Sequence, residues 1–97
     1  MDLFVIRRRT AWATPADLEA AAARSAAEGD KAGSGVRWIR TYVVEESDGT
    51  LGSVCIYEGE SPEAVRAHAE RSAMPADEIT PVADTVIVRP DPAPVAA

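Results

Sequence analysis

The chain has 97 residues, which is enough for a single domain with a thin hydrophobic core. Ten basic and sixteen acidic residues give a net charge of −6, which argues against a nucleic acid as partner. A single cysteine cannot form an internal disulfide and no apolar run approaches the ~20 residues that cross a bilayer, so we expect a cytoplasmic protein away from membranes.

The first predicted elements are a short strand and a helix. The apolar, β-branched run at Asp2–Arg7 predicts the strand, and the arginines at Arg7–Arg9 are expected to form a solvated rim at its end. Thr14 before a proline is a helix start signal, and Gly29 is a stop signal. Together they predict a helix over residues 15–28, with an alanine-rich face that packs closely on its neighbour.

A hairpin, a second helix and a last strand are predicted next. Two segments rich in β-branched and aromatic residues flank the turn sequence SDGT at residues 47–50, which indicates an antiparallel hairpin. Ser61 and Pro62 repeat the helix start signal. The run at Asp84–Arg89 predicts the last strand, and the Pro-rich tail at residues 90–97 cannot continue a ladder.

The predicted order β-α-β-β-α-β is that of ferredoxin-like folds, in which two helices cover one face of a four-stranded antiparallel sheet. We therefore predict an α+β fold of this class, with a single domain over residues 1–89 and a flexible tail over residues 90–97. The second face of the sheet is then open within one chain.

The two faces of the predicted hairpin differ in character. If the turn is centred on Asp48 and Gly49, paired residues have numbers that sum to about 97, and one face is small and aliphatic. That face suits the alanine-rich helices, so the open face would carry an aromatic and polar set of Trp38, Arg40, Tyr42, Ser53, Cys55 and Tyr57. A bulge at Gly52 would shift the register by one residue and invert this assignment.

An aromatic open face is too apolar to remain in water on a small monomer. Packing against a second copy about a two-fold axis is the simplest cover, so we expect a homodimer through this face. A few polar groups among aromatic residues are also typical of a cleft for a small-molecule ligand, here with Trp38, Arg40, Tyr42, Cys55 and Tyr57 as candidate lining residues. A dimer interface without a ligand is the alternative.

The only cysteine and the only histidine, Cys55 and His68, are expected at similar heights but on opposite sides of the sheet. A nucleophilic Cys-His pair needs hydrogen-bond contact, so this placement excludes one within a subunit. His68 is expected at the edge of the buried helix face, bonded to a carbonyl or water. Alternatively it is a metal ligand, with Glu58 and Glu63 supplying oxygen atoms, although the sequence has no zinc-like His/Cys spacing.

Three stretches of the chain resemble a family of short bacterial domains similar to a described nickel-binding, ferredoxin-like dimer. They are VRWIRTYVV from Val36, CIYEGESPEAVRAHAERSAMPAD from Cys55, and the closing IVRP. The resemblance covers Val36–Asp77 well, and it implies a dimer and a divalent metal such as nickel. The chain departs from the family at Ala67, where an acidic residue typically precedes the histidine.

These observations leave three functions to compare, and no motif identifies a catalytic residue. The first, which we favour, is a non-catalytic dimer that binds a divalent metal such as nickel through His68 and nearby carboxylates. The second is an enzyme of the dimeric α+β-barrel kind, such as a cyclase, isomerase or cofactor-free oxygenase, acting on a small organic molecule. In it, Arg40, Tyr42 and Tyr57 would orient the molecule, and Cys55 or His68 would transfer a proton. The third is a structural partner without a site.

Overall fold

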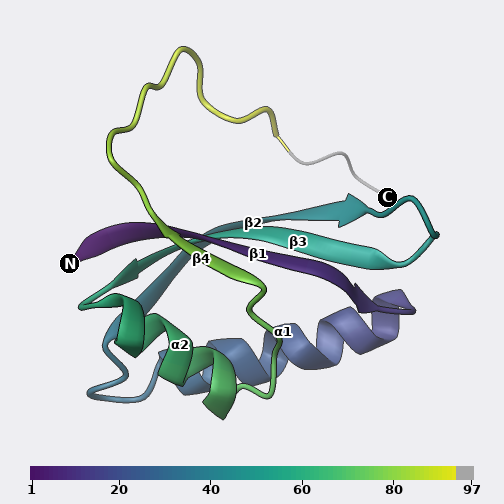
Figure 1. Ribbon diagram of the computed structural model, residues 1–97, viewed down its shortest axis with the longest axis horizontal. Coiled ribbons are helices and arrows are strands. Elements are labelled where there is room, and N and C mark those ends of the chain that lie inside the picture. Colours follow the sequence, from purple (N-terminus) through teal and green to yellow (C-terminus); the bar gives the residue numbers. More distant parts are fainter. Residues whose placement is uncertain (94–97) are drawn as a thin grey trace.

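The computed structural model describes residues 1–93 and contains four strands and two helices in the predicted order (Figure 1). The strands are β1 (Asp2–Trp12), β2 (Val36–Glu45), β3 (Leu51–Gly59) and β4 (Glu78–Pro81), and the helices are α1 (Pro15–Gly29) and α2 (Pro62–Arg71). All neighbouring strands are antiparallel, in the order β2-β3-β1-β4. Both helices cover the same face of the sheet (Figure 1), so the predicted α+β, ferredoxin-like fold is confirmed.

The helix boundaries follow from local capping signals. Thr14 has extended backbone geometry and its Oγ1 accepts a hydrogen bond of 3.2 Å from the backbone N–H of Asp17. Ser61 accepts a hydrogen bond of 3.1 Å from the backbone N–H of Ala64 in the same way. None of the helices in residues 1–93 is long and apolar enough to cross a membrane.

The hairpin loop is one residue longer than a turn centred on Asp48 and Gly49 would make it. The backbone N–H of Glu46 donates to the carbonyl of Thr50 over 2.9 Å, which leaves three residues in the loop. Gly49 takes the positive φ of 86° that three-residue loops require. The numbers of paired residues therefore sum to 96, as in Tyr42 opposite Val54. This shift of one residue turns the side chains of β3 to the other face relative to those of β2, so the predicted assignment of faces is wrong.

A bulge in β2 changes the face on which its side chains lie a second time. Trp38 pairs with Tyr57 but Arg40 pairs with Ile56, so Ile39 is an extra residue on this strand. The bulge lies at Ile39 and not at Gly52, where the sequence suggested one. It separates Trp38 from Arg40 and Tyr42, which stay on the open side. Trp38 is instead on the helix side, beside the buried residues Ser53, Cys55 and Tyr57.

The last strand is earlier in the chain than predicted. The short connection after α2 brings Glu78–Pro81 to the free edge of β1 first, where Thr80 pairs with Val5. Asp84–Arg89 is therefore left outside the sheet, and the prediction of a strand there is wrong. Beyond Val82 the chain turns away from the sheet and arches over its open face (Figure 1). Of the predicted tail, residues 94–97 lie outside the described residues.

The hydrophobic core lies between the sheet and the helices. It consists of Phe4, Ile6, Val36, Cys55, Tyr57 and Val65. A Cβ atom placed on Gly59 would come within 2.6 Å of Cγ2 of Val65, so glycine is required where α2 crosses β3. His68, three residues after Val65 in α2, is also buried.

Candidate functional site

A buried polar cluster lies on the helix side of the sheet, and we define it as Arg8, Ser25, Cys55, Tyr57 and His68. Each of these residues is at most 2% exposed. They come from β1, α1, β3 and α2, so the cluster forms only when sheet and helices pack together. A buried polar group is costly unless it is hydrogen-bonded, which makes the partners of each member informative.

Ser25 joins Tyr57 to His68. Its Oγ lies 2.7 Å from the hydroxyl of Tyr57 and 3.1 Å from Nε2 of His68. The rings of Tyr57 and His68 are tilted against each other with centroids 5.4 Å apart. His68 is therefore fully buried and bonded to a side chain, whereas the sequence placed it at the edge of the buried helix face.

Burial disfavours the charged form of both rings of this network. Burial is the main cause that lowers the pKa of His68, and the positive charges of Arg71 and Arg8 lower it further. Burial likewise raises the pKa of Tyr57. Nδ1 of His68 is buried and has no hydrogen-bond partner within residues 1–93.

Cys55 lies on the same side of the sheet as His68, so the prediction that the sheet separates them is wrong. Its Sγ accepts hydrogen bonds of 3.2 Å from Nη1 of Arg8 and from Oγ1 of Thr41. Among the hydrogen bonds of residues 1–93, none joins Cys55 to His68. The conclusion that the two residues do not form a nucleophilic pair therefore holds, although for a different reason.

Sequence reasoning missed Arg8, which it assigned to a solvated rim. The side chain is 0% exposed, and its Nε and Nη2 have no hydrogen-bond partner within residues 1–93. The signal was present in the alternation of β1, because Phe4, Ile6 and Arg8 are on one face of a strand with a period of two. The strand continues to Trp12, five residues beyond its predicted end.

The residues proposed from the sequence as metal ligands do not come together in one chain. Glu58 is on the open side of the sheet and pairs with Arg37 at 3.3 Å, whereas Nε2 of His68 is bonded to Ser25 on the helix side. Glu63 is exposed in the first turn of α2. Within residues 1–93, no three His, Cys, Asp or Glu side chains are close enough to hold a metal ion, so a single described chain does not fit a nickel site.

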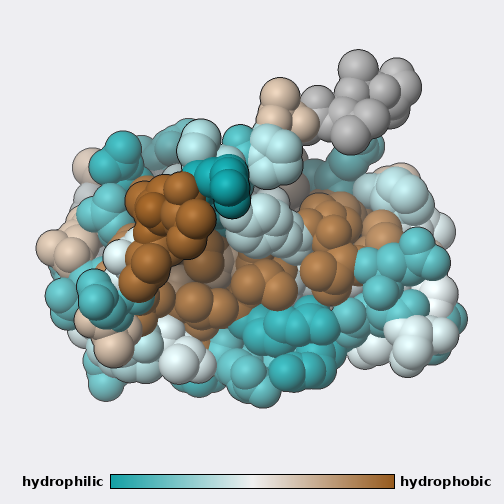
Figure 2. Space-filling model, turned by 90° about the horizontal axis from the view of Figure 1, so that it is seen from above, coloured by the Kyte–Doolittle hydropathy of each residue, from teal (hydrophilic) through white to brown (hydrophobic). Residues whose placement is uncertain are grey.

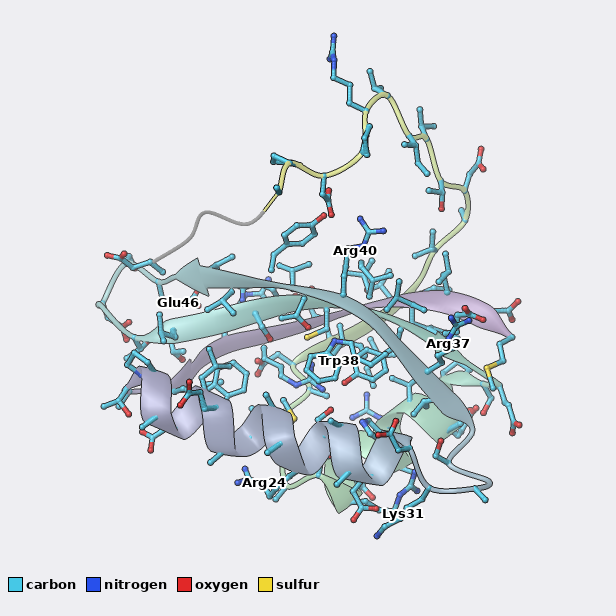
Figure 3. All side chains as sticks on the ribbon, turned by 180° about the vertical axis from the view of Figure 1, so that it is seen from behind. Arg24, Lys31, Arg37, Trp38, Arg40 and Glu46 are labelled. Carbon is cyan, nitrogen blue, oxygen red and sulfur yellow. The ribbon has the colours of Figure 1, made fainter. Side chains whose placement is uncertain are left out.

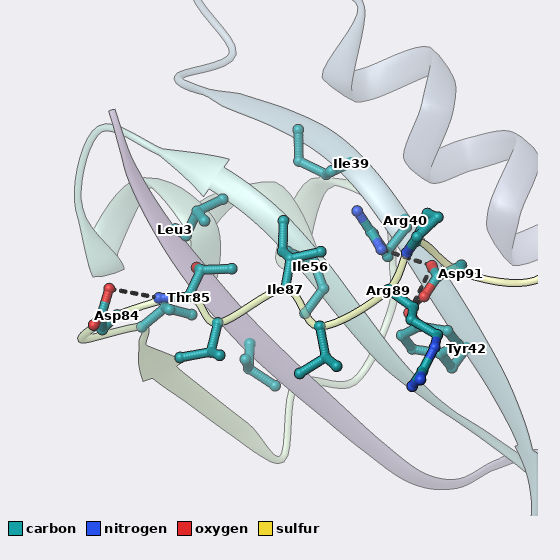
Figure 4. Close-up of a pocket in the computed structure, with 15 residues that line it drawn as sticks. Leu3, Ile39, Arg40, Tyr42, Ile56, Asp84, Thr85, Ile87, Arg89 and Asp91 are labelled. Atoms are coloured by element: carbon teal, nitrogen blue, oxygen red, sulfur yellow. Dashed lines mark hydrogen bonds and ion pairs between the residues drawn. The ribbon is translucent and has the colours of Figure 1, made fainter.

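The second candidate site is a groove on the open face, defined by the sheet below and the arching tail above (Figure 4). Its volume is about 990 Å³, and its floor is apolar, with Leu3, Val5, Ile39 and Ile56. Brown apolar surface extends across this side of the molecule in Figure 2.

One end of the groove carries polar side chains. Nη1 of Arg40 lies 2.6 Å from a carboxylate oxygen of Asp91, and the hydroxyl of Tyr42 donates to the same carboxylate over 2.8 Å. Arg40 points toward the tail and Trp38 lies between the sheet and α1 (Figure 3), so the five predicted cleft residues belong to two different sites. Arg40 and Tyr42 are in the groove, and Trp38, Cys55 and Tyr57 are not.

The family model for nickel responsive proteins, SCO4226-like, matches residues 4–82. The chain belongs to this family. The crystal structure of SCO4226 from Streptomyces coelicolor A3(2) is similar, with 29% sequence identity and a TM-score of 0.68 over 87% of this chain and 99% of that chain. No curated protein matches the chain. The SCO4226-like match confirms the resemblance to a nickel-associated family, and it ends at residue 82, so the tail above the groove lies outside the family match.

Proposed function

We propose that this SCO4226-like protein is a non-catalytic, homodimeric binding protein of the cytoplasm that takes up a divalent metal such as nickel. The observation that carries the proposal is the apolar face of the sheet that the helices leave open, in a chain of a nickel-responsive family. The open face has an apolar floor that no helix of residues 1–93 covers, made up of Leu3, Val5, Ile39 and Ile56. Face-to-face packing of two such sheets would remove that floor from water.

We place the metal at the interface between the two copies. One described chain lacks a group of three ligands, and a two-fold axis doubles every carboxylate on the open side, including Glu58. His68 is less suited, because binding through Nε2 would break its hydrogen bond to Ser25 inside the core. Carboxylate oxygens are ordinary ligands for divalent ions, although they are less selective for nickel than imidazole.

Nickel titration of the purified protein, with native mass spectrometry for stoichiometry and mass, tests this proposal. We expect a dimer that binds nickel, and Glu58→Gln should weaken binding by at least about tenfold, because even the hydrogen-bond partners of metal ligands typically contribute about 10–100-fold to metal affinity. His68→Ala should leave nickel affinity unchanged in protein that is still folded by circular dichroism. A folded His68→Ala protein without nickel binding would place the metal in the core instead. A dimer that binds no nickel would remove the metal from the proposal.

An enzyme of the dimeric α+β-barrel kind is the second candidate. Arg40 and Tyr42 favour it, since two hydrogen-bond donors at the end of an apolar groove suit an organic molecule with a carboxylate. Against it, Cys55 and His68, the residues suggested for proton transfer, are on the other side of the sheet. A small organic molecule retained by the purified dimer in native mass spectrometry would favour this function over metal binding.

A further inference from the structure

A second cavity lies on the helix side of the sheet, between α1 and the strands β2 and β3. Its volume is about 240 Å³. We call it the helix-side pocket, and its walls include Trp12, Ala22, Trp38, Val43, Cys55 and Tyr57. It shares no lining residue with the groove on the open face, so it depends on neither the proposed dimer nor the proposed metal.

The pocket opens to solvent at the free edge of β2. This strand is the last one on its side of the sheet, and α1 presents only the small side chain of Ala22 toward it. Trp38 and Val43 are on the helix side, yet they are 36% and 51% exposed, because α1 does not cover them. Figure 3 shows Trp38 between the sheet and α1. A small molecule can therefore reach the pocket past these two residues without unfolding the chain.

Aromatic rings form much of the wall. Trp12, Trp38 and Tyr57 all line the pocket, and Trp38 stacks on Tyr57 with ring centroids 6.0 Å apart and an angle of 5° between the planes. Such rings attract a further ring through offset stacking or edge contacts. An apolar cavity of roughly 150 Å³ holds one benzene molecule, so the helix-side pocket has room for two fused rings.

The polar atoms of the wall and its charge favour a neutral molecule. Nε1 of Trp38 donates to Oγ1 of Thr41 over 2.7 Å, and that hydroxyl donates to Sγ of Cys55 over 3.2 Å. None of the buried side-chain atoms that lack a partner within residues 1–93 belongs to a residue of the wall. In the described part of the chain, Glu19 is the only charged side chain that lines the pocket. An anionic molecule would therefore meet a carboxylate and find no basic partner.

We propose that the helix-side pocket binds a small, neutral aromatic molecule of one or two fused rings. The molecule enters between Trp38 and Val43 and packs its ring against Trp12 and Trp38. Its burial supplies the packing contacts that a hollow beside the core takes from the surrounding side chains. This ligand differs in class from the carboxylate that would suit Arg40 and Tyr42 in the groove.

The test is isothermal titration calorimetry of the full chain with indole, and with indole-3-carboxylate as the charged analogue. We expect indole to bind, and the carboxylate to bind at least about tenfold more weakly because its charge would be buried without a partner. Ala22→Leu fills the pocket from α1 with a good helix former and should weaken indole binding by at least about tenfold. Circular dichroism checks that this variant is folded.

Ala23→Leu is the matched control. Ala23 is the next residue of α1 and is exposed away from the pocket, so its replacement should leave indole affinity unchanged. A nuclear magnetic resonance titration of the wild-type chain needs no variant, and indole should shift the side-chain N–H signals of Trp12 and Trp38, the two tryptophans of the sequence.

Three results would overturn the proposal. The first is a wild-type chain that does not bind indole. The second is indole binding that a folded Ala22→Leu protein retains in full, or that shifts the signals of Ile56 on the open face and neither tryptophan. The third is tighter binding of indole-3-carboxylate than of indole, which would refute a neutral ligand.

Discussion

Trp38 and Arg40 are two positions apart in β2 and lie on opposite sides of the sheet, the reverse of what a regular strand produces. Trp38 stacks on Tyr57 on the helix side, with ring centroids 6.0 Å apart, whereas Arg40 binds Asp91 above the open face. The bulge at Ile39 is the cause. Together with the three-residue loop, the bulge divides one predicted cleft between the helix side and the groove.

Substitutions on the two faces should therefore have different effects. Ile56→Lys places a charge in the apolar floor of the groove, and we expect it to dissociate the proposed dimer while the chain remains folded. Trp38→Ala should leave the dimer intact and lower the free energy of unfolding by about 2 kcal/mol, less than for a fully buried aromatic residue because Trp38 is 36% exposed. Light scattering and urea unfolding measure the two effects. Dissociation by Trp38→Ala together with a dimeric Ile56→Lys protein would contradict the assignment of faces.

Ser25→Ala should destabilise the core strongly for so small a change. The hydroxyl of Tyr57 and Nε2 of His68 would both lose their partner, and each unsatisfied buried polar group costs about 1–3 kcal/mol. The urea midpoint measures the loss. Tyr57→Phe is the control, because it removes one hydrogen bond and keeps the contact between Ser25 and His68. A loss from Tyr57→Phe as large as that from Ser25→Ala would speak against a shared network.

His68 should make stability depend on pH. Its pKa is lowered in the folded protein by burial first and then by Arg71 and Arg8, while the carboxylate of Glu28 acts in the opposite direction. In the unfolded chain, His68 takes up a proton as the pH falls through its ordinary pKa of 6.5. In the folded chain the pKa is lower, so His68 takes up its proton only at a lower pH. The free energy of unfolding is therefore highest above pH 7, falls as the pH decreases below 6.5, and levels off below the folded pKa.

Urea unfolding at pH 7.5, 6.5 and 5.5 measures this slope, and His68→Gln should remove it. The carboxyl groups whose pKa values are lowered, namely Glu28, Glu46 and Asp48, lose their contribution only in a more acidic range, below their ordinary values of 4.5, 4.5 and 3.8. Their titration is thus separated from that of His68. An unchanged slope in the His68→Gln protein would mean that another group is responsible.

Arg8→Met should maintain or raise stability. The buried guanidinium has one hydrogen bond, to Sγ of Cys55, and no carboxylate partner within residues 1–93, so an apolar side chain of similar length removes an uncompensated charge. Replacing a buried ion pair by apolar residues is often neutral or stabilising by about 1–4 kcal/mol, and Arg8 has no ion-pair partner to leave behind. Differential scanning calorimetry measures the change in Tm. A large loss of stability would show that Arg8 binds a partner in solution.

Arg7→Met is the matched control for that experiment. Arg7 is on the opposite face and pairs with Glu46 at 2.7 Å, with further hydrogen bonds to the carbonyls of Arg8 and Ser53. Its replacement should lower Tm. Equal changes in the two variants would indicate a general effect of charge removal in β1.

Elements governed by contacts near in sequence were predictable from the sequence alone. Thr14 and Ser61 cap their helices as expected, since a cap needs only a side-chain oxygen and a backbone N–H three residues later. The order of strands and helices, and with it the ferredoxin-like fold, follows from the same local signals. The nickel-responsive family was likewise recognisable from Val36–Asp77.

Which side chains lie on which face of the sheet was decided only in the tertiary structure. A loop of three residues instead of two and one extra residue at Ile39 are small local changes, yet each inverts every side chain beyond it because the period of a strand is two. Likewise, Asp84–Arg89 has the composition of a strand, but Glu78–Pro81 reaches the edge of β1 first. Pairing depends on which segment arrives at a free edge, and that competition involves residues more than seventy positions apart.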